Sequence, residues 1–202
     1  MNPKETALLL IEYQNDFTTP GGIFHDAVKG VMENNHMLAN TVATLVQARQ
    51  LGIKIIHLSV SFAHGYPELP VEPYGILKGV AERKAFLAGT WGARITDALP
   101  CAASDIVIEG KCGLDGFAST GLDFVLRNNG VRTIAIGGFL TNCCVEGTAR
   151  SGYDKGYNVI TLSDCTAALS LEEQQAAVSY NFPMFSRPMK HDQFLQAFIA
   201  EK

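Results

Sequence analysis

The sequence predicts an α/β fold: a three-layer α-β-α sandwich built on a mostly parallel, Rossmann-like, six-stranded sheet. Two observations predict it. Short β-branched or aliphatic runs recur without polar alternation, which is typical of strands covered on both faces. Between them lie segments of helical period that end at glycines, as before Gly52 and Gly130. Because such strands and helices alternate along the chain, we expect parallel strands with helices packed on both faces.

The apolar runs define the expected strands. Five are expected over residues 7–13, 53–60, 105–110, 132–138 and 158–164, and a sixth over 182–186. Successive strands starting near 105, 132 and 158 leave just enough chain for a crossover helix between them. "SLEE", from Ser170 to Glu173, has the pattern of a capping box and predicts the start of another helix. The segment 61–104 lacks this rhythm, and we expect a long excursion that lines a site.

Composition narrows the class of protein. With 202 residues, 47% of them hydrophobic and 18% charged, we expect a single domain over 1–202. The net charge of −4 and the absence of a basic run argue against a nucleic-acid partner. The apolar stretch near the N-terminus ends at Glu12, too short for a signal peptide or a membrane span, so we expect no membrane partner and a cytoplasmic protein. The five cysteines are odd in number and contain no C-x-x-C pair, which favours free thiols over disulfides or a cysteine zinc site.

Three reactive side chains follow three predicted strands. Glu12 ends the first strand, Lys111 follows the third, and the loop after the fourth carries Cys144. Because open parallel sheets place their chemistry at the carboxyl ends of the strands, these groups are expected to converge. On spacing alone, a structural ion pair of Glu12 with Lys111 beside packed cysteines fits equally well.

The position of Cys144 favours a catalytic role over a structural one. It is expected in the first turn of a helix that begins near Asn142, where unpaired N–H groups and the helix dipole lower the pKa of a thiol. Lys111 would act in the same direction, and a carboxylate can accept the thiol proton. The N–H groups of that turn can hold an oxyanion, so the arrangement suits acyl transfer.

Four segments carry a family resemblance over nearly the full length. They are "ALLLIEYQNDF" at the start, "GTWGA" (89–93), "IEGKCGLDGFASTGLDFVLRNNG" (108–130) and "GGFLTNCCVEGTARSGYDKGYNV" (137–159). Together they resemble the isochorismatase-like cysteine hydrolases, which include nicotinamidases and other amidases. The resemblance implies a small-molecule substrate and a homo-oligomer.

The resemblance also implies site residues by position. The family's catalytic carboxylate, lysine and cysteine correspond to Glu12, Lys111 and Cys144, which leaves Cys143 as a bystander. The mechanism that follows is a thioester one. Glu12 takes the thiol proton, Cys144 attacks the carbonyl, Lys111 keeps the site electropositive, and Glu12 then protonates the leaving amine and activates water.

A backbone feature is implied as well. The family has a cis peptide before the nucleophile, here between Phe139 and Leu140, and an oxyanion hole formed by two backbone N–H groups, here those of Leu140 and Cys144. A non-proline cis bond is costly and is usually retained at functional sites.

The chain departs from the family pattern at its carboxylate. The usual residue is aspartate, whereas Glu12 is longer by one methylene, and Asp16 is the fallback base. Either the strand end is displaced to suit the longer side chain, or the base is misplaced and activity is weak. We favour displacement, because the lysine and the cysteine are both present.

The likeness to nicotinamidase itself is weaker. Its metal site is expected after the second strand, where this chain has His57 and His64 without a "D-x-H" pair, so we expect packing and loop roles for them and no metal. No organic cofactor is implied. Isochorismatase itself cleaves a vinyl ether and does not need the thiol, so with an intact cysteine the resemblance implies cleavage of a carbon–nitrogen bond of amide, imide or ureide type. Phe17, Trp91 and Phe117 are candidate pocket walls, with core packing equally open for each.

Two other classes of function remain. A binding or scaffold protein with the fold but without the chemistry would be consistent with Glu12. A nucleotide-binding Rossmann domain would need a G-x-G-x-x-G turn after the first strand, and "EYQNDFTTPGG" lacks one, so it ranks last.

Overall fold

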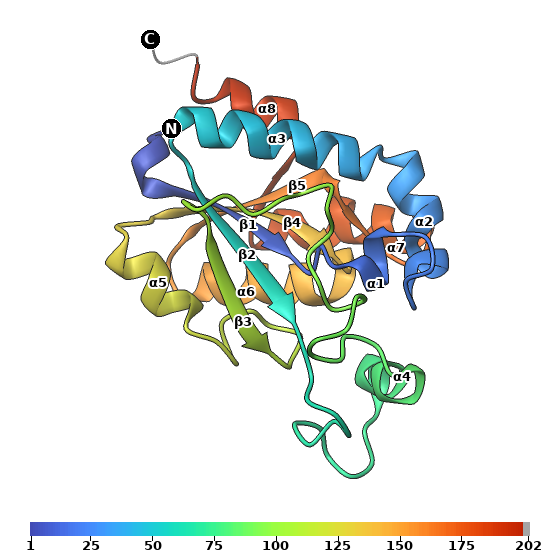
Figure 1. The fold of residues 1–202 in the computed structure, drawn as a ribbon. Helices are drawn as coiled ribbons and strands as arrows, with labels where there is room; N and C mark the ends of the chain where they lie inside the picture. Colours follow the sequence, from blue (N-terminus) through green and yellow to red (C-terminus); the bar gives the residue numbers. More distant parts are fainter. Residues whose placement is uncertain (200–202) are drawn as a thin grey trace.

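The computed structural model describes residues 1–199 and contains one sheet of six parallel strands (Figure 1). The strand order is β3-β2-β1-β4-β5-β6, and each neighbouring pair is parallel. The strands are β1 (Thr6–Ile11), β2 (Lys54–Val60), β3 (Ile106–Lys111), β4 (Thr133–Phe139), β5 (Asn158–Ala167) and β6 (Arg187–Met189). The predicted α/β fold is confirmed.

Helices cover both faces of this sheet. In Figure 1, α3 and α8 lie above the sheet, and α5 and α6 lie below it. The helices are α1 (Asn15–Thr18), α2 (His25–Asn34), α3 (Met37–Leu51), α4 (Gly75–Arg83), α5 (Leu122–Asn128), α6 (Glu146–Asp154), α7 (Leu171–Ala176) and α8 (His191–Gln196). Short 3-10 turns occupy Pro3–Glu5 and Phe182–Met184, and π-helical turns occupy Thr141–Val145 and Ala177–Asn181. None of the helices among residues 1–199 has the length and apolar character to cross a bilayer.

Strand β1 shows why the apolar runs are continuous. All six of its residues are buried. Leu8 and Leu10 face the core under α2, α3 and α8, whereas Leu9 and Ile11 face the core under α5 and α6. A central strand therefore needs apolar side chains on both faces, and its pattern cannot alternate with polar residues.

The sixth strand was predicted at the wrong place. The residues 182–186 form a 3-10 turn and its exit, with Pro183 in the first turn, and β6 follows at Arg187–Met189. Phe182 and Phe185 are buried in the core beside α6. Their apolar pattern reflects a buried turn, which a run of this length does not distinguish from a short strand.

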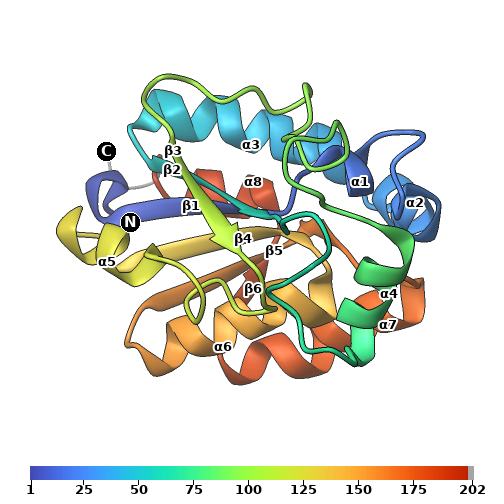
Figure 2. The same cartoon turned by 60° about the horizontal axis from the view of Figure 1, so that its bottom comes forward.

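The excursion after β2 lies across the carboxyl edge of the sheet. It contains α4, and two isolated bridges hold it, between Phe62 and Leu87 and between Gln14 and Ile95. Figure 2 shows α1, α4 and α7 on the side toward which the strands run. Strand order reverses between β1 and β4, so the crevice of an open α/β sheet is expected beside these two strand ends.

Candidate active site

Glu12 lies where β1 ends and the chain turns. Its backbone N–H donates to Leu58 O at 2.9 Å, and its φ of 57° is in the left-handed region. A non-glycine residue in that region costs energy and is held there by its surroundings. The side chain is 3% exposed, so the turn directs a carboxylate into the protein.

The residues after Glu12 hold this turn in place. The Gln14 side chain donates to Val60 O at 2.8 Å and to Ala93 O at 2.7 Å, and accepts from Val60 N at 2.9 Å. The Asp16 carboxylate accepts from Phe86 N at 2.7 Å and from Ile23 N at 3.2 Å. Asp16 therefore supports the loops around the site, and these two hydrogen bonds make it a poor fallback base.

Lys111 ends β3 and has no exposed surface. Its Nζ donates to Glu12 Oε1 at 2.5 Å and to Gly113 O at 2.5 Å. Burial alone would lower its pKa, but the charge of Glu12 and the interactions with Glu12 and Cys144 more than offset this, so the pKa is raised. The lysine is therefore a fixed cation beside the carboxylate.

The turn that carries Cys144 follows β4 directly. Gly138 has φ 140°, and a Cβ there would lie 2.0 Å from Ile11 O, so only glycine fits against β1. The Phe139–Leu140 peptide bond is cis, as the resemblance implies. Cys144 then lies in the π-helical turn Thr141–Val145, ahead of α6, rather than in the first turn of a regular α-helix near Asn142.

The pKa of Cys144 differs from the expectation. A position in the first turn of a helix predicts a lowered pKa. In the structure, a hydrogen bond with Cys143, burial and the carboxylate of Glu12 raise it, and Lys111 opposes them only in part. The hydrogen bond between the two thiols lowers the pKa of Cys143. Cys144, 7% exposed, is therefore a neutral thiol at rest and needs a base to become a nucleophile.

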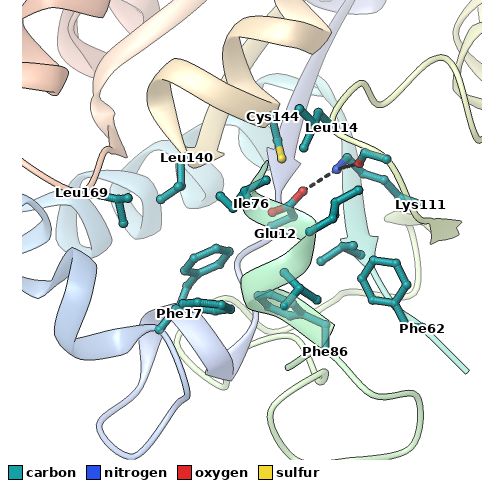
Figure 3. A pocket seen from close by; sticks show the side chains of 15 residues that line it. Glu12, Phe17, Phe62, Ile76, Phe86, Lys111, Leu114, Leu140, Cys144 and Leu169 are labelled. Carbon is teal, nitrogen blue, oxygen red and sulfur yellow. Dashed lines mark hydrogen bonds and ion pairs between the residues drawn. The ribbon is translucent and has the colours of Figure 1, made fainter. Parts of the chain in front are cut away.

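Cys144, Glu12 and Lys111 line one cavity of about 90 Å³. Figure 3 shows the sulfur of Cys144 directed toward the Glu12 carboxylate, and the ion pair to Lys111 beside it. Each comes from a different strand end, so the predicted convergence of the three groups is confirmed.

The structure places one of the three candidate pocket walls in the cavity beside Glu12, Lys111 and Cys144. Phe17 lines the cavity. Trp91 does not line it; this residue is 41% exposed, and its backbone carbonyl accepts from Asn15 Nδ2 at 2.9 Å. Phe117 is buried on the opposite face of the sheet, in the core beside α6, where its ring stacks on Tyr157.

Most of the cavity wall was not identified residue by residue. The excursion 61–104 supplies Phe62, Phe86 and three residues of α4, as its irregular sequence indicated only in general terms. Phe24, Leu114 and Leu169 join the wall from other segments and had no sequence signal.

A buried glutamine of α7 supports the turn Thr141–Val145, which carries Cys144. Gln174 Oε1 accepts from Thr141 Oγ1 at 2.6 Å and from Ala168 N at 3.0 Å, and Gln174 Nε2 donates to Thr166 Oγ1 at 3.1 Å. The capping box is only half formed: Ser170 accepts from Glu173 N, but the Glu173 carboxylate accepts from Leu169 N.

His57 and His64 do not line the cavity that holds Glu12, Lys111 and Cys144, which we call the triad. His57 is buried on β2 with Nε2 3.3 Å from Asp105 Oδ2, and His64 is exposed in the loop after β2. Across residues 1–199, no group of three or more His, Cys, Asp or Glu side chains is placed to hold a metal ion.

A family model describing the isochorismatase domain matches residues 6–193. The chain belongs to the isochorismatase family. Members of this family are hydrolases and include amidases and nicotinamidase.

Solved structures agree in fold. A cysteine hydrolase from Pseudomonas syringae pv. phaseolicola is 23% identical, with 100% of this chain and 96% of that chain covered and a TM-score of 0.87. N-carbamoylsarcosine amidase from Thermoplasma acidophilum is 21% identical, with 93% and 97% covered and a TM-score of 0.70. Nicotinamidase from Bacillus subtilis is 21% identical, with 92% and 99% covered and a TM-score of 0.72.

Proposed function

We propose that this isochorismatase-family protein is a cysteine hydrolase that cleaves a carbon–nitrogen bond of a small molecule through a thioester. The observation that carries the proposal is that a buried thiol, a carboxylate and a lysine line one small cavity. A carboxylate paired to a buried lysine beside a neutral thiol is an arrangement of base and nucleophile.

The proposed reaction starts from the neutral thiol. Glu12 takes the proton of Cys144 as the sulfur attacks the carbonyl, and the backbone N–H groups of Leu140 and Cys144 hold the oxyanion. Glu12 then gives the proton to the leaving nitrogen, and an amine departs. Water, deprotonated by Glu12, adds to the thioester and releases a carboxylic acid. The departing sulfur of Cys144 takes the proton back from Glu12, while Lys111 keeps its positive charge throughout.

A catalytically inactive binding protein is the alternative. Substitution of each of the two adjacent cysteines in turn distinguishes a hydrolase from such a protein. We expect Cys144→Ser to abolish release of ammonia from small amides, a loss of at least about 1000-fold, because a serine hydroxyl is a far weaker nucleophile at this base. The measurement is ammonia release over a panel of primary amides and ureides.

Cys143→Ser is the matched control. It makes the same chemical change one residue away, and we expect it to keep most of the activity. Equal losses in the two variants would refute the assignment of the nucleophile. The absence of turnover in the wild-type protein with every compound would favour the binding protein.

A further inference from the structure

The cavity wall around the triad is almost wholly hydrocarbon. Four phenylalanines contribute to it, Phe17, Phe24, Phe62 and Phe86, and α4 adds Ile76, Leu77 and Val80. Among the described residues that line the cavity, the ionisable side chains are those of the triad alone. A substrate group that lies beyond the scissile bond therefore meets apolar surface.

The one cation of the wall is already satisfied. Lys111 Nζ is bonded to Glu12 Oε1 and to Gly113 O, both at 2.5 Å, and the lysine is fully buried. Its charge is balanced by Glu12. A substrate carboxylate placed here would lose its hydration without gaining an ion pair, and it would lie near the Glu12 carboxylate.

One cation, Arg83, packs on a residue of the wall. Its guanidinium lies 5.6 Å from the centre of the Phe24 ring. Arg83 is not among the lining residues. It therefore packs on an aromatic residue of the wall without presenting its charge to the cavity.

The size of the cavity limits the occupant. An apolar cavity of about 150 Å³ holds a benzene molecule, and this one is about 90 Å³. By that comparison, a hydrocarbon chain of about three to four carbons beyond the carbonyl fits this space.

We infer that the site takes small uncharged amides whose acyl group is a short hydrocarbon chain, and that it rejects acyl groups that carry a carboxylate. This inference rests on the proposed function and adds its substrate class. Burial of the substrate's hydrocarbon chain against the wall supplies binding energy. Side chains of α4 set the preference for a hydrocarbon acyl group over one that carries a carboxylate. The acid product, which ionises on release, is held poorly by the same wall.

A matched pair of amides tests the inference. Pentanamide and glutaramate have the same length and differ only in a terminal methyl or carboxylate group. We expect kcat/KM for pentanamide to exceed that for glutaramate by at least about 100-fold, because the buried carboxylate has no partner. From acetamide to pentanamide, kcat/KM should rise about fourfold for each added methylene. Equal rates for the pair, or no dependence on chain length, would overturn the inference.

A cationic analogue addresses the aromatic residues of the wall. 5-Aminopentanamide matches hexanamide in length, and its ammonium group can bind to phenylalanine faces. We expect hexanamide to be the better substrate. A preference for the amine would overturn the inference in favour of cation recognition.

Variants of Leu77, which is half-buried on α4, test whether this helix determines the substrate preference. Leu77→Lys should raise the ratio of glutaramate to pentanamide turnover at least about tenfold, and Leu77→Ala should move the optimum to longer chains. Val46→Lys on exposed α3 surface is the charge control and should change neither. Leu77→Ala keeps the test valid if Leu77→Lys fails to fold. An unchanged ratio and an unchanged optimum would overturn the role of α4.

Binding separates this inference from the proposed function. Calorimetry with Cys144→Ala should show pentanamide binding and no glutaramate binding, whether or not the wild-type protein turns either over. Binding with this preference but without wild-type turnover would defeat the proposed function alone. Turnover of both amides at equal rates would defeat the substrate class alone, and binding of neither would also overturn it.

Discussion

At the scale of single residues, Glu12 has two tasks in the proposed reaction. It neutralises Lys111, with which it forms an ion pair of 2.5 Å, and it takes the proton of Cys144. A buried charge without a partner is strongly destabilising, so the first task is structural. The second is chemical, because the raised pKa of Cys144 leaves the thiol protonated at rest.

Glu12→Gln separates these tasks. We expect turnover to fall by about 100-fold or more, because the amide cannot accept the thiol proton. The pKa of Cys144 should fall in the same variant, because the carboxylate charge of Glu12, which raises it, is removed while the charge of Lys111, which lowers it, stays. Alkylation by iodoacetamide, followed by mass spectrometry from pH 5 to 10, should therefore shift to lower pH while hydrolysis is lost. Cys143→Ser as the background for both proteins assigns the signal to Cys144.

Unchanged turnover in Glu12→Gln would mean that another group accepts the proton. An unchanged alkylation profile would mean that the carboxylate does not act on the thiol, whatever happens to hydrolysis. Circular dichroism checks that the unpaired lysine has not unfolded the variant.

Glu12→Asp tests whether the backbone is set for the longer side chain. The shorter carboxylate should lie farther from Cys144, and we expect at least a tenfold loss of kcat with KM little changed. Steady-state kinetics of the wild-type and variant proteins supply both values. Higher activity in the variant would show that glutamate is a handicap and would favour a decayed enzyme.

At the scale of elements, strand ends were predictable and the cavity wall was not. The continuous apolar runs located five strands, and the rule for parallel sheets then brought Glu12, Lys111 and Cys144 to one edge. These inferences depend on local pattern and on a general topology. The cis bond at Phe139 came from the family resemblance, since no local pattern indicates it.

The wall depends on long-range packing. Phe17 and Phe117 are both buried phenylalanines, yet they lie in different cores on opposite faces of the sheet. The path of the chain between the strands decides which face of the sheet such an aromatic side chain reaches. Sequence spacing does not encode that path. Leu77 and Leu169, from two separate segments, entered the wall for the same reason.

Gln14 joins three elements at the site, the ends of β1 and β2 and the loop that contains Ala93. Gln14→Ala would leave the buried N–H and C=O of Val60 without these partners, and we expect a loss of about 2–4 kcal/mol in the free energy of unfolding. Turnover should fall as well, because Glu12 lies two residues before it. Urea denaturation measures the stability, and Gln47→Ala on the exposed face of α3 is the control, expected within about 0.5 kcal/mol of wild type. A Gln14→Ala variant as stable as this control would contradict the role.

At the scale of the whole molecule, buried charge occurs near both edges of the sheet. The Glu12–Lys111 pair lies at the carboxyl edge. Near the amino end of β3, Asp105 accepts from Arg49 of α3 and lies 3.3 Å from His57 of β2. This second cluster joins a helix, a strand and the loop before β3, away from the carboxyl edge of the sheet where Glu12 and Lys111 lie.

His57 should make the stability of the fold depend on pH. Burial lowers its pKa, and the hydrogen bond and charge of Asp105 offset this only in part. The unfolded chain therefore binds a proton on His57 at a higher pH than the folded protein does, and stability falls as pH drops below about 6.5. Burial raises the pKa of Asp105, but its hydrogen bonds, above all that from Arg49, outweigh burial and leave the pKa lowered, so its contribution is lost only below about pH 3.9.

His57→Gln tests this device in the window between those two values. Glutamine can keep a hydrogen bond to Asp105 but does not titrate, so the fall in Tm between pH 7 and pH 5 should be smaller in the variant than in the wild-type protein. His64→Gln, in the exposed loop, is the matched control and should melt like wild type at both pH values. Differential scanning calorimetry at each pH gives the comparison. If His57→Gln loses as much Tm on acidification as the wild-type protein, the acid sensitivity comes from another group, and the buried His57 is only a packing residue.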